Sequence, residues 1–263
     1  MLGQRVASAV VGVPLIFLLI IVGGNWYVAA IAAVLAIACL EFQHPRFGWT
    51  HPLTLLAAAF AAALAGGAHV GLDWIIWFTA GALLLTLAVV VLVGFEAERS
   101  FFDWQWAVAG IVYTGFLGSF LVLLRDLPNG RDWVFLTVLS TWAMDTTAYF
   151  GGRAFGGRKL APRISPGKTV EGFAFGWVGG FAAALLLNYF LGLRIEGWQI
   201  VALGALLPVA AILGDLSESA MKRGMHIKDS SELIPGHGGV MDRIDSILFT
   251  FALVYLFTQW VVV

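Results

Sequence analysis

Long apolar stretches follow one another along almost the whole chain, and they constrain its fold more than any other feature. A helix needs roughly 20 apolar residues to cross the hydrocarbon core of a bilayer. Hydrophobic residues make up 60% of the 263 residues and charged residues only 12%, whereas a soluble domain usually carries about a quarter charged residues. This deficit indicates lipid as the solvent, and we predict an all-α integral membrane protein.

Nine apolar stretches are candidates for membrane-spanning helices, and the second is the shortest. Tryptophan opens five of them, as expected for an aromatic belt at the membrane surface. The first is longer than a usual signal-peptide core and lacks a good cleavage site, so we expect it to be retained. The nine stretches are 6–23, 26–40, 52–68, 74–94, 104–124, 133–150, 169–193, 198–216 and 244–263.

The basic residues are distributed unevenly between the two faces that nine spans would create. Twelve of the 15 fall in connections on the side of the N-terminus, which the positive-inside rule assigns to the cytoplasm. We therefore expect a multi-pass protein of the inner (plasma) membrane with a cytoplasmic N-terminus and an external C-terminus. The two long polar loops, 151–168 and 218–243, lie on the same cytoplasmic side.

This distribution also suggests how the chain is organised. We expect residues 1–130 to form a helical scaffold with possible dimer contacts. Residues 131–263 would then form the catalytic membrane region and carry both polar loops. The formal net charge of −1 gives no reason to expect a nucleic-acid partner.

Asp145 lies inside the otherwise apolar stretch 133–150. At a rise of 1.5 Å per residue it sits about 8 Å from the end of that helix. A carboxylate inside a membrane is costly and is a functional candidate by default. Structural pairing with a loop arginine is the alternative.

A second set of polar residues ends the eighth apolar stretch. If that helix continues past the membrane surface, Asp215, Glu218, Ser219 and Lys222 share one face. Lys222 and Arg223 also fit a purely structural role, because the helix dipole favours cations at a C-terminus. A carboxylate there opposes the dipole, so we expect Asp215 to have a cationic partner.

Asp242 and Asp245 open the ninth stretch, three residues apart and on one helical face. Helix capping is one explanation, because the dipole favours anions in the first turn. Together with Asp215 at the same membrane surface, they instead favour a divalent cation. Oxygen-rich clusters of this kind suit Mg²⁺ or Mn²⁺.

The two polar loops contain glycines that let the backbone approach a ligand closely. In the loop 228–239, His237 is equally compatible with a ligand contact and with a structural role. The loop 151–168 is typical of an anion site at the start of a helix. Its basic residues are Arg153, Arg158, Lys159, Arg163 and Lys168.

The second loop and its flanks also match a known signature. The signature is a Ser, then Lys-Arg, Lys-Asp, Pro-x-His-Gly-Gly and Asp-Arg-x-Asp. It is present here as Ser219, 222–223, 228–229, 235–239 and 242–245. On these residues, and on the earlier block 145–172, the chain resembles the phosphatidate cytidylyltransferases, also called CDP-diacylglycerol synthases. The resemblance covers roughly residues 141–250, and the first half matches only as a set of spans.

The resemblance implies that phosphatidic acid and CTP react to give CDP-diacylglycerol and pyrophosphate. It also implies a homodimer. Asp215 and Asp242 would hold the catalytic Mg²⁺, with K⁺ as a candidate second cation, and Asp245, Lys222 and Asp145 would complete the catalytic set. The implied substrate-binding residues are Lys168, Arg223, Lys228, Asp229, His237, Gly238, Gly239, Arg243, Ser165 and Ser219.

Three other functions remain open at this point. A related CTP-dependent polyprenol or phytol kinase-like enzyme, or an archaeol-type cytidylyltransferase, would differ only in the acceptor. An ion-coupled transporter would use Asp145 and Asp215 as a relay. Against the transporter, the charges gather on one face, without an obvious polar route to the other.

Overall fold

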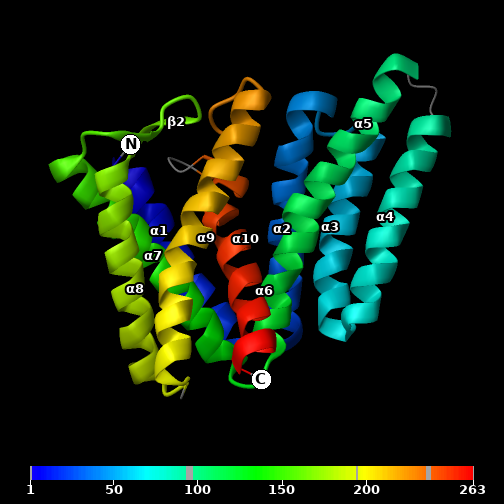
Figure 1. Cartoon of the computed structure of the whole chain (residues 1–263). Coiled ribbons are helices and arrows are strands. Elements are labelled where there is room, and N and C mark those ends of the chain that lie inside the picture. Colours follow the sequence, from blue (N-terminus) through cyan, green and yellow to red (C-terminus); the bar gives the residue numbers. More distant parts are fainter. Residues whose placement is uncertain (1, 93–96, 194, 235–237, 263) are drawn as a thin grey trace. The chain divides into compact units, whose positions relative to one another are not determined.

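The chain folds almost entirely into helices (Figure 1), in a computed structural model that describes residues 2–92, 97–193, 195–234 and 238–262. It forms two compact units. The first contains Met1–Asp126 and Asp229–Arg243, and the second contains Leu127–Lys228 and Ile244–Val263. Each unit is therefore built from segments that are distant in the sequence.

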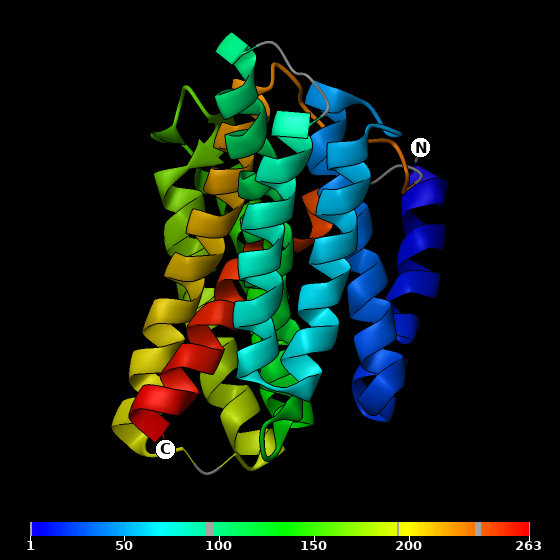
Figure 2. The same cartoon turned by 90° about the vertical axis from the view of Figure 1, so that its right-hand side faces the viewer.

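The first unit consists of the N-terminal helices and the segment that precedes α10. Helices α3 and α4 run side by side in both views (Figure 2). Helix α3 also packs against the π-helix η1: a Cβ on Gly115 of η1 would lie 2.8 Å from Ala61 Cα of α3, so small residues let these two helices approach closely. The elements are α1 (Leu2–Val22), α2 (Gly24–Phe47), α3 (Pro52–Val70), α4 (Leu72–Leu92), α5 (Ala97–Gly110), the π-helix η1 (Ile111–Phe116) and α6 (Leu117–Asp126).

The second unit is built around the close pair α7 and α8. A Cβ on Gly176 would lie 2.8 Å from Ala148 Cβ and 3.0 Å from Met144 O, so the glycine permits backbone contact. The elements are α7 (Gly130–Phe155), β1 (Lys159–Ala161), β2 (Ser165–Thr169), α8 (Val170–Leu191), α9 (Gly197–Gly224), α10 (Met241–Phe257) and the π-helix η2 (Thr258–Val262). The first three residues of α10 belong to the first unit.

Among the described residues, seven helices are long and apolar enough to cross a membrane. The all-helical class, with several candidate membrane spans, is thus confirmed, whereas the number nine and the orientation stay predictions. Ser8–Val22 is apolar but shorter, and α7, with Asp145 in its middle, is not among the seven. The seven are Gly24–Phe47, Pro52–Val70, Leu72–Leu92, Arg99–Asp126, Val170–Leu191, Gly197–Gly224 and Met241–Val262.

Two local expectations differ from the structure. The predicted loop 151–168 contains an antiparallel hairpin of β1 and β2, in which Lys159 pairs with Thr169 and Ala161 with Ser165. The loop predicted at 218–243 is helical as far as Gly224, because α9 continues past the apolar stretch. The hairpin was missed because its strands are only three and five residues long and lack alternating hydrophobicity.

Candidate functional site

Asp215 has a cationic partner, as predicted, although α9 continues beyond it to Gly224 and the end of the helix is therefore not the reason. Lys168 Nζ, from β2, forms an ion pair with Asp215 Oδ2. Ser219, one turn further along α9, donates a hydrogen bond from Oγ to Asp215 Oδ1 at 3.4 Å. The structure therefore brings together three predicted site residues, two of them 47 positions apart.

The hairpin that carries Lys168 is attached to the first turn of α8. Thr169 caps this helix, because its Oγ1 accepts a hydrogen bond from Gly172 N at 3.0 Å. The Glu171 carboxylate accepts hydrogen bonds from Gly157 N (3.0 Å) and Arg158 N (3.2 Å) on the other side of the hairpin. These contacts hold β2 against α8 and thereby restrict the position of Lys168.

Next to Asp215, Gly214 lets α9 lie directly against the backbone of α10. A Cβ on Gly214 would lie 2.5 Å from Asp245 O and 3.0 Å from Ser246 Cα, so a side chain at 214 would collide with backbone. Asp245 is within electrostatic range of Asp215, Asp145 and Lys168. Three predicted carboxylates and one predicted cation therefore gather in the second unit.

The predicted polar face of α9 is present, but one of its members has a structural partner. Lys222 Nζ lies 2.6 Å from Glu218 Oε2, and both side chains are almost fully buried. Removing one partner of such a pair leaves an uncompensated buried charge. Glu218 is therefore important for keeping the Lys222 ammonium in place.

Arg223 connects the end of α9 to the hairpin. Its Nε donates to Ile164 O at 3.3 Å, and its Nη1 donates to Ile227 O at 3.1 Å. The residue is exposed, and its guanidinium has five N–H donors.

Asp242, in the first unit, is held by backbone and hydroxyl donors. Its Oδ2 accepts hydrogen bonds from Ser230 N (3.1 Å), Ser230 Oγ (3.0 Å) and Gly239 N (2.8 Å). Gly238 has a φ of 82°, and a Cβ there would lie 2.7 Å from Asp242 Oδ2. The glycines of the signature thus let the chain turn tightly around this carboxylate.

Glu41 is the residue that the sequence analysis missed. It is fully buried on α2, and its carboxylate accepts hydrogen bonds from Ser231 Oγ (2.5 Å), Val240 N (3.0 Å), Met241 N (2.7 Å) and Ser230 Oγ (3.2 Å). The available signal was a single charge directly after the apolar stretch 26–40, which marked the end of a span. Because α2 continues to Phe47, Glu41 lies inside a helix.

The other predicted residues have less defined surroundings. Ser165 begins β2 opposite Ala161. Lys228 and Asp229 are exposed where the chain passes from one unit to the other, and Arg243 is exposed in the first turn of α10. His237 lies outside the described residues.

The carboxylates of Asp215 and Asp242 are each of a chemical type that can bind Mg²⁺. Among the described residues, no group of three His, Cys, Asp or Glu side chains forms a ready-made metal cage. Mg²⁺ usually binds to one or two carboxylates together with substrate phosphates, and does not need such a cage. The oxygen donors of Asp215 and Asp242 are of the type that this ion prefers.

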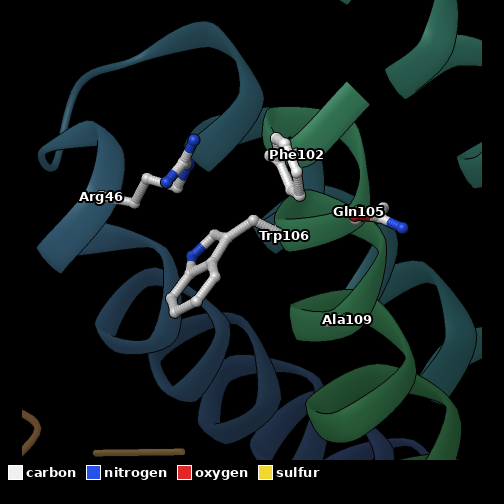
Figure 3. A pocket seen from close by; sticks show the side chains of 5 residues that line it. All are labelled: Arg46, Phe102, Gln105, Trp106 and Ala109. Carbon is white, nitrogen blue, oxygen red and sulfur yellow. The ribbon is translucent and has the colours of Figure 1, made fainter. Parts of the chain in front are cut away.

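A cavity of about 400 Å³ lies elsewhere in the first unit (Figure 3). Arg46, beside it, is paired with Asp103, with Nη2 and Oδ1 2.6 Å apart. None of the predicted site residues lines this cavity. Its lining residues are Arg46, Phe102, Gln105, Trp106 and Ala109.

Comparison with known proteins places these residues in a family context. The sequence model described as "Cytidylyltransferase family" matches residues 3–261. The phosphatidate cytidylyltransferase of Synechocystis sp. is 34% identical over 97% of this chain and 95% of its own length. That of Pseudomonas aeruginosa is 36% identical over 94% and 93%, respectively. That of Brucella abortus is 42% identical over 68% of this chain, and this match spans 64% of the relative, slightly less than two thirds.

Proposed function

The chain belongs to the cytidylyltransferase family, and we propose that it transfers the cytidylyl group of CTP to phosphatidic acid. The products would be CDP-diacylglycerol and pyrophosphate. The observation that carries the proposal is the agreement between the signature at 219–245 and similarity to phosphatidate cytidylyltransferases over nearly the whole chain. A transporter or a polyprenol or phytol kinase-like enzyme is not favoured by these relatives.

The proposed reaction is a substitution at the α-phosphorus of CTP. A phosphate oxygen of phosphatidic acid attacks this phosphorus, the bond to the bridging oxygen of the β-phosphate breaks, and pyrophosphate leaves. Catalysis of phosphoryl-type transfer is mostly positioning and neutralisation of charge. The cations proposed for that task are Lys168, Lys222, Arg223 and Arg243.

Lys168 has the clearest role among these cations. Its ammonium group is ion-paired with the Asp215 side chain, and the residue lies on β2, which is attached to α8. A flexible lysine that is ion-paired with a carboxylate is able to exchange that partner for a substrate phosphate. We infer that Lys168 passes from Asp215 to CTP or to the lipid phosphate when substrate binds.

We propose that Asp215 and Asp242 hold Mg²⁺, that Asp245 and Asp145 support the site electrostatically, and that K⁺ is a candidate second cation. A bound Mg²⁺ neutralises phosphate charge and orients the reacting groups. The remaining proposed substrate contacts are Ser165, Ser219, Lys228, Asp229, His237, Gly238 and Gly239.

The location of the proposed site follows from the distribution of charge. Nine membrane crossings with the N-terminus inside would place the signature on the cytoplasmic face of the inner membrane. CTP is soluble, whereas phosphatidic acid is in the bilayer, so a site at that surface reaches both. A homodimer is the proposed assembly, by resemblance to the family.

The proposal is tested by incubating purified protein with phosphatidic acid, radiolabelled CTP and Mg²⁺. We expect a labelled CDP-lipid and one pyrophosphate per turnover, with no product when EDTA removes the metal. Polyprenols and archaeol-type lipids serve as competing acceptors in parallel reactions. Absence of CDP-lipid with every phosphatidic acid tested, or preferred turnover of another acceptor, would reject the assigned substrate.

A further inference from the structure

The carboxylate of Glu41 meets four hydrogen-bond donors, and all of them come from the segment 229–241. The donors on Ser231 and Val240 point at Oε1, and those on Ser230 and Met241 point at Oε2. These groups are separated from Glu41 by up to 200 positions in the sequence. The contact is therefore long-range, and all of it lies within the first unit.

A carboxylate suits this position better than a neutral side chain. Val240 and Met241 stand at the start of α10, where backbone N–H groups lack partners within the helix. An anion at a helix N-terminus is stabilised by these groups and by the dipole. Because Glu41 is fully buried, its charge is compensated only if such donors remain in place.

The same segment holds Asp242. Ser230 Oγ lies 3.2 Å from Glu41 Oε2 and 3.0 Å from Asp242 Oδ2, so the two carboxylates share the single proton of this hydroxyl. Gly239 N donates to Asp242 at 2.8 Å, and a Cβ on Gly239 would collide with Ser230 Oγ and lie 2.6 Å from Glu41 Oε2. A displacement of Glu41 would therefore move donors that position Asp242.

From this geometry we propose that Glu41 is a positioning residue for cytidylyl transfer. It touches no reacting group. It holds residues 230–231 and 239–241 in the arrangement in which Asp242 is presented from the first turn of α10. This inference rests on the function proposed above, because Asp242 matters here as a residue of the proposed catalytic set.

The first test compares Glu41→Gln with the wild-type protein. The amide keeps the size of the side chain but replaces one acceptor by a donor, so two buried donors lose their partner. We expect kcat to fall about 10–100-fold, the usual loss when a group that orients a metal ligand is changed. We also expect faster hydrogen exchange of the peptide covering 229–241 in the absence of CTP and metal.

Gln43→Met is the matched control. Gln43 is also fully buried on α2, but its Nε2 donates to Ala107 O, away from the segment that holds Asp242. We expect this variant to lose thermal stability while its kcat and the exchange of 229–241 stay at the wild-type level. Ser231→Ala removes one donor at a partly buried position of the cluster without altering α2, and should lower kcat by a smaller factor.

The outcomes separate this inference from the proposed function. Wild-type kcat and wild-type exchange in Glu41→Gln would overturn the positioning role, while CDP-lipid formation by the wild type would leave the function intact. Equal losses of kcat in Glu41→Gln and Gln43→Met would also overturn it, because they would show general destabilisation of α2. If Glu41→Gln does not fold, unchanged kcat and exchange in Ser231→Ala would overturn it. If the wild type makes no CDP-lipid, the proposed function fails by itself, and the exchange experiment still reports whether Glu41 holds the segment.

Discussion

The two carboxylates proposed as metal ligands are held in different ways. Asp215 is paired with a lysine side chain from a hairpin, whereas Asp242 accepts hydrogen bonds from two backbone N–H groups and a serine hydroxyl. A lysine side chain has many rotamers and exchanges partners readily, but a backbone donor moves only with its segment. The comparison suggests that Asp242 is pre-organised, while Asp215 changes partner when substrate and metal bind.

The largest effect is expected from removing either carboxylate. Asp242→Asn and Asp215→Asn should each lower CDP-lipid formation by roughly 10²–10³-fold or more, the range seen when a group that stabilises transition-state charge is lost. Only Asp242→Asn should also increase hydrogen exchange in the segment 229–241. Retained turnover in Asp242→Asn would remove this residue from the metal site. Equal hydrogen exchange of 229–241 in both variants would contradict the inference that only Asp242 is held by this segment.

Lys168→Met tests whether Asp215 changes its partner when substrate and metal bind. Hydrogen bonds to charged groups contribute about 1.5–3 kcal/mol, so loss of the phosphate contact should lower kcat/KM for CTP about 10–100-fold. The concentration of Mg²⁺ that gives half-maximal rate should fall, because Asp215 no longer has a competing cation. The control is Lys159→Met, which changes an exposed lysine on β1 of the same hairpin and should keep the wild-type rate.

Ser230→Ala tests whether the donors around Asp242 pre-organise its carboxylate. It removes one of three hydrogen bonds to Asp242 Oδ2 and leaves the two backbone donors, so kcat should fall by no more than about tenfold. A steady-state assay at saturating CTP measures this change. A loss as large as that of Asp242→Asn would mean that the backbone donors alone do not hold the carboxylate.

The smallest effect is expected at the cap of α8. Thr169→Ala removes the acceptor for Gly172 N and should cost about 1 kcal/mol of stability, equivalent to a fall in Tm of roughly 2–4 °C. Because Thr169 follows Lys168, the KM for CTP should rise slightly. Thr169→Ser retains the hydroxyl and should restore both values, and a variant indistinguishable from wild type in Tm would show that the hairpin is held without this cap.

The candidate site was predictable to the extent that its residues lie on regular local structure. Asp215, Ser219 and Lys222 were expected on one helical face, and α9 does continue through them. Asp215 was expected to have a cation, and Lys168 provides it. The identity of that cation was not predictable, because the hairpin that carries Lys168 has no hydrophobic alternation and its strands were not recognised.

The sequence by itself determined the membrane-helical class, the family and the carboxylates at which chemistry is proposed. These follow from apolar length, charge scarcity and fixed spacings, which are properties of neighbouring residues. Only the tertiary structure decided that Gly214 brings α10 beside Asp215, and that Glu41 receives four donors from a segment about 190 positions away. Such contacts depend on how closely backbones pack and on which buried donors need an acceptor. Neither can be predicted from the pattern of neighbouring residues in the sequence.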